Sequence, residues 1–278
     1  VKAKADELFA DNQYKRMTTS TSFWGAFNWD RQSYALYNDP SVSTTSKTDA
    51  QKADTKAAIL NADFRRAVYA AFSAHAYEAI ARGEELADDV IRNTLVPYTF
   101  VVTSDGHNYG SLVEKYVSEM LPEYEGIDLT DGHDAWYNPD NAKIFAERAK
   151  EALGDSVSEW PVHIDIPVDG ANENFKNMAL AMHVQAVVDD ADAAVGDERI
   201  ELFAKAEAML LSGGFLRPFS TSGGSLAVSR VKPFTVAYSL YGQASYNAVP
   251  YFKYMQLLDE PVLADDYYAA KEAWLKGE

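Results

Sequence analysis

The sequence contains no cysteine among its 278 residues. Disulfides, thiolate metal sites and cysteine nucleophiles are therefore all excluded. The sequence also lacks any apolar run close to the roughly 20 residues that a helix needs to cross a bilayer. We therefore expect no membrane-spanning helix in this chain.

Basic residues are scarce relative to acidic ones. Lys and Arg number 25 and Asp and Glu number 42, which gives a formal net charge of −17. Such a surface repels a phosphate backbone, so nucleic acid is not an expected partner. Solubility is the simplest interpretation of the acidity, and cation binding is the alternative.

Motifs for reaction chemistry are missing as well. The five histidines include no HExxH pair, so a zinc site is not expected, and His75 is interpreted as a packing residue. The aspartates of residues 128–134 lack the bidentate glutamate of an EF-hand, and a solvated turn before a capped helix is the simpler interpretation. Residues 220–225 lack the P-loop lysine, and no GxSxG sequence is present. We therefore predict no catalytic residue, no metal and no cofactor, and expect that the chain is not an enzyme.

Aromatic residues, in contrast, are abundant: 17 Tyr, 13 Phe and 5 Trp. They gather in residues 23–34, 234–246 and 251–254. A hydrophobic core alone can account for them. Aromatic walls beside strand backbone also suit an extended peptide, which is held through main-chain hydrogen bonds whatever its sequence. The function that these residues favour is capture of a ligand.

Hydrophobic periodicity predicts a mixed α/β protein. Asn61 or Asp63 is expected to cap a helix before Phe64, and Asn138 with Pro139 marks another helix start. Asp265 is expected to cap the last helix. A helical stretch is expected from residue 49, and it leads into the Phe64 helix, which is expected to end near residue 83. Further helices are expected over 84–93, 109–120, 139–153, 175–211 (broken near 196) and 265–276. Strands are expected over 18–37, 160–168, 215–219, 226–232, 234–240 and 249–257.

Several motifs, taken in order, resemble one family. Ile59-Leu-Asn-Ala-Asp-Phe-Arg-Arg-Ala-Val-Tyr-Ala-Ala-Phe72 follows the aromatic run Ser22-Phe-Trp-Gly-Ala-Phe-Asn-Trp29. A Tyr-Asn-Pro-x-x-Ala-Lys helix start lies at Tyr137, and Ser229-Arg-Val-Lys-Pro-Phe234 and a final Ala-x-x-Ala-Trp-Leu-Lys segment follow. Together these motifs are similar to the oligopeptide-binding lipoproteins of Gram-positive ABC importers (Ali/Ami type). The resemblance extends over nearly the whole chain.

The resemblance implies a two-lobed α/β fold of the periplasmic-binding-protein (Venus flytrap) type, in which peptide binds between lobes that close by hinge rotation. It implies an exported protein on the extracellular face of the cell membrane, held there by an N-terminal lipid anchor outside this sequence. The expected partners are an oligopeptide ligand and the permease subunits of an ABC transporter, and the expected state is a monomer. A receptor for peptide pheromones on the same fold is the alternative, and a peptidase-like hydrolase is a further one.

By the same resemblance, residues 1–29 end the N-terminal lobe and form a hinge strand. Residues 30–215 form the C-terminal lobe, and residues 216–278 return through the hinge and end in a helix. Two parts of the family pattern are missing, namely the N-terminal half and a long excursion between Asp165 and His183. We therefore expect a missing segment near residues 177–178.

The residues expected to contact peptide lie on the hinge strand and on the returning strand. They are Ser22, Phe23, Trp24, Phe27, Ser220, Ser222, Gly223 and Tyr238. Packing within the hinge is the alternative interpretation of each.

Overall fold

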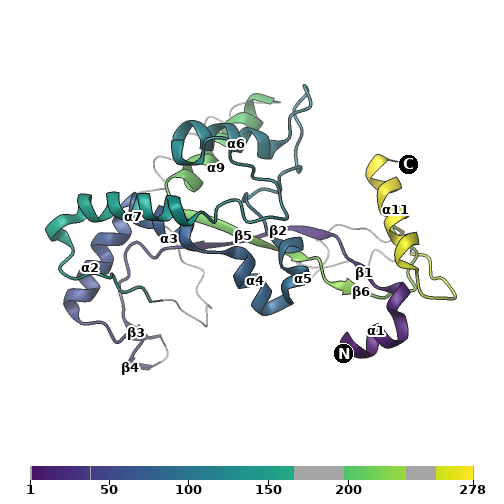
Figure 1. Cartoon of the computed structure of the whole chain (residues 1–278), viewed down its shortest axis with the longest axis horizontal. Coiled ribbons are helices and arrows are strands. Elements are labelled where there is room, and N and C mark those ends of the chain that lie inside the picture. Colours follow the sequence, from purple (N-terminus) through teal and green to yellow (C-terminus); the bar gives the residue numbers. More distant parts are fainter. Residues whose placement is uncertain (1, 38, 166–196, 236–254, 278) are drawn as a thin grey trace. The chain divides into compact units, whose positions relative to one another are not determined.

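The computed structural model describes residues 2–37, 39–165, 197–235 and 255–277 (Figure 1). The described residues form both helices and strands, which agrees with the expected mixed α/β class. The chain divides into two compact units: Val1–Thr21 with Thr221–Glu278, called the first unit, and Ser22–Ser220, called the second unit. None of the helices in the described ranges is long and apolar enough to cross a membrane.

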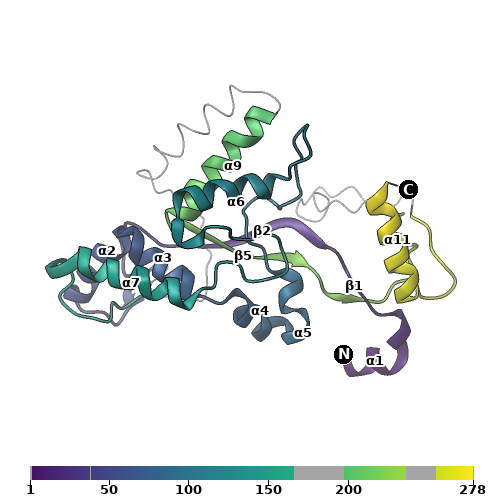
Figure 2. The same cartoon turned by 45° about the horizontal axis from the view of Figure 1, so that its top comes forward.

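Helices make up most of the second unit. Its α-helices are α2 (Asp49–Leu60), α3 (Ala62–Ala71), α4 (Ala74–Arg82), α5 (Glu84–Ala87), α6 (Tyr109–Met120), α7 (Pro139–Leu153) and α9 (Asp197–Ser212). Short 3-10 helices follow at η2 (Asp88–Val90), η3 (Pro122–Tyr124) and η4 (Gly154–Ser156). Helix α3 packs on α7, and α6 packs on α9; Figures 1 and 2 show both pairs side by side.

Two hydrophobic clusters hold these helices together. One joins α3, α6, α7 and α9 around Val113, Phe145 and Ala204, all fully buried. The other joins α2, α3 and α7 and includes Ile59 and Phe64. Because each helix buries one apolar face against a neighbour, the helices stabilise one another through packing rather than through their own propensity.

Side-chain caps explain why the helical stretch expected over 49–83 forms three helices. The Asn61 side chain accepts a hydrogen bond from the N–H of Phe64 at 2.9 Å, and Ser73 accepts from Ala76 at 3.1 Å. Both capping residues have extended backbone, which ends one helix and starts the next. The cap expected at Asn61 is confirmed, as are the start of α7 at Asn138 and the bounds of α6.

Strand predictions were less accurate than helix predictions. The strand expected over 18–37 is β2 (Thr18–Ala26), followed after a turn by β3 (Ala35–Leu36), which pairs antiparallel with β4 (Asp39–Ser43). No strand forms in residues 160–165, where Pro161 has no N–H to donate to a ladder. Strand β2 pairs with β5 (Leu216–Gly223), and the 226–232 strand shrinks to β6 (Leu226–Ala227).

The first unit is built around an aromatic cluster. It contains α1 (Lys2–Phe9), η1 (Ala10–Asn12), β1 (Tyr14–Lys15), which pairs antiparallel with β6, and α11 (Ala264–Lys276). Tyr14 stacks on Tyr267 of α11 with ring centroids 3.8 Å apart. The cap expected at Asp265 is wrong: α11 begins after Leu263 without a side-chain cap, and Asp265 lies inside its first turn.

Some predictions fall outside the described residues. These are the helical pattern over 175–196, most of the strands over 234–240 and 249–257, and the missing segment near 177–178. Helix α9 is described from Asp197 and ends at Ser212, before Gly213, as the sequence predicts for its C-terminal end. The division into residues 1–29, 30–215 and 216–278 remains a prediction.

Candidate functional site

Ser22 is the first candidate residue on β2, and its hydroxyl has two partners. Ser22 Oγ donates to the carbonyl oxygen of Leu95 at 2.6 Å and accepts from Arg92 Nη1 at 3.3 Å. These bonds join β2 to the segment that follows η2. Ser22 is therefore held in place before any ligand binds.

Phe23 and Trp24 are the most exposed candidates. Their side chains are 47% and 44% exposed, which is unusual for adjacent large aromatic residues of a strand. Successive strand residues point to opposite faces, so each face of β2 carries one accessible ring here. Among the described residues, the Ser22–Ala26 part of β2 pairs with β5 alone.

Strand β5 is occupied on its other side by a segment of the second unit. Ser220 forms an antiparallel bridge with Ile91, and the N–H of Arg92 donates to the carbonyl of Phe219 at 3.3 Å. Ser220 is only 3% exposed. In this conformation Ser220 contributes to packing of the strand pair.

Phe27 likewise belongs to the core. It is 8% exposed, lies in the cluster with Ile59 and Phe64, and its ring centroid is 5.2 Å from that of Tyr69. In this structure Phe27 is therefore a packing residue of the core, which was the alternative interpretation.

The remaining candidates belong to the first unit or are not described. Ser222 Oγ lies 2.7 Å from Thr19 Oγ1. Gly223 has φ +95°, and a Cβ there would lie 2.5 Å from the carbonyl oxygen of Met17, so only glycine fits. Tyr238 lies outside the described residues. The structure thus joins Ser22, Phe23 and Trp24 on one strand, and contact of any candidate with peptide stays a prediction.

Arg92 is a buried residue beside Ser22 that the sequence analysis did not single out. Its side chain is buried, and Nη2 and Nε both lie 3.3 Å from Asp131 Oδ2. Burial lowers the pKa of Arg92 and raises that of Asp131, and each is partly offset by the charge of the other. A buried arginine in an irregular segment has no distinguishing pattern in one sequence.

The acidic loop at residues 128–134 is more than the expected solvated turn. Asp131 holds Arg92, while Asp134 Oδ1 accepts from the buried Arg217 at 2.7 Å. Asp134 Oδ2 also accepts from the N–H of Ala74, in the first turn of α4, at 2.6 Å. These carboxylates face separate protein partners, and no cluster of metal-ligating residues occurs within the described ranges.

His75 differs from its interpretation as a packing residue. Its Nδ1 lies 2.6 Å from Asp88 and its Nε2 lies 2.9 Å from Glu84, and the ring is partly exposed. The hydrogen bond to Asp88, and to a smaller extent the one to Glu84, raises the pKa of His75. The residue therefore joins α4 to α5 and η2 by hydrogen bonds.

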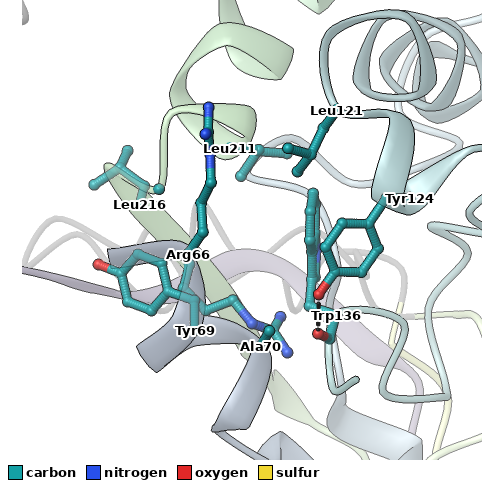
Figure 3. A pocket seen from close by; sticks show the side chains of 10 residues that line it. Arg66, Tyr69, Ala70, Leu121, Tyr124, Trp136, Leu211 and Leu216 are labelled. Carbon is teal, nitrogen blue, oxygen red and sulfur yellow. Dashed lines mark hydrogen bonds between the residues drawn. The ribbon is translucent and has the colours of Figure 1, made fainter. Parts of the chain in front are cut away.

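A small cavity lies elsewhere in the second unit (Figure 3). Tyr69, Leu121 and Trp136 contribute to its lining, and Tyr124 Oη donates to the Trp136 carbonyl at 2.8 Å beside it. Its volume is about 20 Å³, which is room for about one water molecule. This cavity is too small for a peptide.

Comparison with known proteins shows which proteins this chain is similar to. The chain is 27% identical over 365 aligned residues to the oligopeptide-binding protein SarA of Streptococcus gordonii, covering 99% of the chain. It is 27% identical to the oligopeptide-binding protein AliA and 26% identical to AmiA, both of Streptococcus pneumoniae, again over 99% of the chain. The chain is a relative of oligopeptide-binding proteins. The resemblance inferred from the motifs is thus confirmed.

The lengths of these relatives also matter. The chain spans about half the length of the oligopeptide-binding proteins it matches, which it covers to 54%. The alignment with SarA has 365 positions, which is 87 more than the 278 residues of this chain. That oligopeptide-binding protein therefore has residues within the aligned span that this chain lacks. No protein-family model matches the chain.

Proposed function

We propose that this chain is part of an extracellular substrate-binding protein that captures oligopeptides and delivers them to the permease of an ABC importer. The observation that carries the proposal is similarity along 99% of the chain to several proteins named as oligopeptide-binding. All of these names describe binding proteins rather than enzymes. The two-lobed fold, the lipid anchor and the monomeric state are part of the proposal.

The geometry of β2 supports peptide capture at this strand. A strand edge offers alternating N–H and C=O groups to an added peptide strand, and exposed rings beside it offer apolar contact to side chains of many kinds. Phe23 and Trp24 provide such rings, and Ser22 fixes the strand through Leu95 and Arg92. We therefore assign peptide contact first to Ser22, Phe23 and Trp24.

Binding of a histidine-free library of random hexapeptides to the full-length protein tests this assignment. Peptide retained with the protein after ultrafiltration is quantified by mass spectrometry. We expect Phe23→Ala and Trp24→Ala each to weaken retention about 5- to 50-fold, since buried aromatic contacts contribute about 1 to 2 kcal/mol or more. Retention equal to that of the wild type in both variants would contradict the assignment to β2.

Tyr137→Ala provides the matched control. Tyr137 is also 44% exposed, but it precedes α7 rather than lying on β2. Its replacement removes a ring of similar exposure and is expected to leave retention unchanged. A loss as large as that of Trp24→Ala would show a general effect of removing exposed aromatic residues.

Two other functions make different predictions for the same sample. A peptidase-like hydrolase would return shortened peptides, whereas a binding protein returns them intact. A pheromone receptor on the same fold would retain few members of the library, whereas a transport protein retains many. No observation in the structure favours either alternative.

A further inference from the structure

Glu207 is a buried carboxylate of the second unit that the proposed function does not yet use. It lies on α9 and is 5% exposed. Its Oε1 accepts from the N–H of Leu95 and its Oε2 from the N–H of Val96 at 3.3 Å. Oε2 also accepts from Tyr109 Oη, on α6, at 2.9 Å. One carboxylate thus fastens an irregular segment to two packed helices.

The same segment is bonded to the candidate binding strand. The N–H of Leu95 donates to Glu207, and the carbonyl of Leu95 accepts from Ser22 Oγ at 2.6 Å. A continuous path of hydrogen bonds therefore runs from α9 through Leu95 to β2. Ser22 is the residue immediately before the exposed pair Phe23 and Trp24.

We infer that Glu207 is a positioning residue for peptide binding: through Leu95 it fixes Ser22, and with Ser22 the part of β2 that carries Phe23 and Trp24. This inference rests on the proposed function, because it gives Glu207 a role in the affinity for peptide. Glu207 itself touches no ligand in this scheme. Its contribution is the placement of a neighbouring main-chain segment.

The protonation state of Glu207 supplies a distinctive signature. Burial raises its pKa to about 7, partly offset by the hydrogen bonds from Leu95, Tyr109 and Val96. The groups that face it from α6 and from the 95–96 segment are these three donors, and no charged side chain of the described residues shifts its pKa. Burial and the nearby Glu207 also raise the pKa of Tyr109, which therefore remains a donor.

Protonation removes acceptor capacity from this arrangement. Above about pH 7 the carboxylate accepts from all three donors. Below it, the oxygen that carries the proton must donate, and the N–H groups of Leu95 and Val96 lose part of their acceptor. We therefore expect the affinity for peptide to fall as the pH decreases from 8 to 6.

Library retention at pH 8 and pH 6 tests the inference with the variant Glu207→Gln in the full-length protein. The amide keeps the shape of the side chain but directs an NH₂ group at one of the donors. We expect retention at pH 8 to fall about 5-fold or more and the Glu207-dependent difference between pH 8 and pH 6 to disappear. Retention in Glu207→Gln that matches the wild type at both pH values would overturn the inference.

Glu114→Gln is the matched control. Glu114 also accepts from one backbone N–H, that of Leu129 at 2.7 Å, and from one tyrosine, Tyr98, at 3.1 Å. These two bonds do not lead to Ser22. Because the peptide's own amino group titrates near pH 8, only the difference between the two variants isolates Glu207. Equal losses in both variants would also overturn the inference.

Amide hydrogen exchange tests the positioning role of Glu207 even if the protein binds no peptide. Wild-type protein that retains no peptide at either pH refutes the proposed function, whereas exchange still reports on the path to β2. We expect Glu207→Gln to speed amide exchange in residues 22–26 as well as at Leu95 and Val96, and Glu114→Gln to leave both segments unchanged. Faster exchange at 95–96 alone would show that Glu207 does not position β2.

Discussion

At the scale of single residues, Arg65 has a structural role that its sequence motif does not reveal. Its buried guanidinium donates to the carbonyl oxygens of Ile59 at 2.8 Å, Gly213 at 2.8 Å and Gly214 at 3.1 Å. It also lies 4.0 Å from the ring centroid of Trp29. Burial lowers the pKa of Arg65 to about 10, so it remains charged at neutral pH. Carbonyl dipoles and an aromatic face stabilise this charge.

Arg65→Lys is expected to lower the free energy of unfolding by about 2 to 4 kcal/mol. A lysine cannot reach three carbonyls with one planar fork, so buried acceptors lose their donors. Urea denaturation followed by circular dichroism measures the change. Arg148→Lys is the control, because Arg148 is half-exposed and pairs with Glu123; we expect a change below about 0.5 kcal/mol. Equal effects of the two substitutions would contradict the role assigned to Arg65.

At the scale of elements, the ion pair of Arg217 with Asp134 connects a strand to a helix. Arg217 lies on β5 and Asp134 precedes α7, and both side chains are largely buried. Asp134 also accepts from the N–H groups of Ala74 and His75 in the first turn of α4. A carboxylate at a helix N-terminus satisfies donors that have no partner within the helix and stabilises the helix dipole.

Asp134→Asn is expected to destabilise the protein by about 3 kcal/mol or more. The amide leaves a buried guanidinium without its counter-charge, which costs more than loss of an exposed pair. Thermal unfolding measures the effect, with Glu272→Gln as the control because its pair with Lys276 is exposed. A loss below about 1 kcal/mol in Asp134→Asn would show that water or another group replaces the carboxylate.

Helices were the elements that the sequence predicted best. Asn138, Pro139 and Gly154 mark both ends of α7, because a cap and a stop are local signals within a few residues. The Asn61 cap was also predicted, although the Ser73 cap, and with it the division between α3 and α4, was missed. Strand lengths were poorly predicted because pairing partners are distant in sequence: β2 and β5 are almost 200 residues apart.

The candidate site was predictable only in part, because local sequence patterns mark some of its residues and distant contacts determine the others. Aromatic runs and family motifs direct attention to Ser22, Phe23 and Trp24, and the structure places these on one partly exposed strand. Phe27 shares the same run, but whether a ring faces solvent or core depends on tertiary packing. Arg92 and Glu207 were missed because a buried charged residue is recognised by its partners, and those lie 70 and 112 residues away.

At the scale of the whole molecule, Glu207 links stability to pH. Its pKa of about 7 in the folded state exceeds the ordinary value of 4.5, so the folded state binds the proton more tightly. Between about pH 4.5 and pH 7 the unfolded state releases that proton first, and the free energy of unfolding therefore falls as the pH rises. The stability that Glu207 contributes is greatest below pH 4.5, and it is lost as the pH rises to about 7.

The wild type is therefore expected to lose stability relative to Glu207→Gln as the pH rises from 5 to 7.5. The steepest slope is about 1.4 kcal/mol per pH unit for a single proton. Urea denaturation of both proteins at several pH values gives the difference, in which contributions of other titrating groups cancel. Parallel pH profiles would show that Glu207 titrates at its ordinary value.

The central claim, peptide capture, is tested most directly by what accompanies the purified full-length protein. Denaturation followed by mass spectrometry releases and identifies any bound molecule. The account predicts a mixture of short, intact peptides of varied sequence, since main-chain pairing at β2 is indifferent to side-chain identity. A protein that releases no peptide, and that retains none from the hexapeptide library, would contradict it.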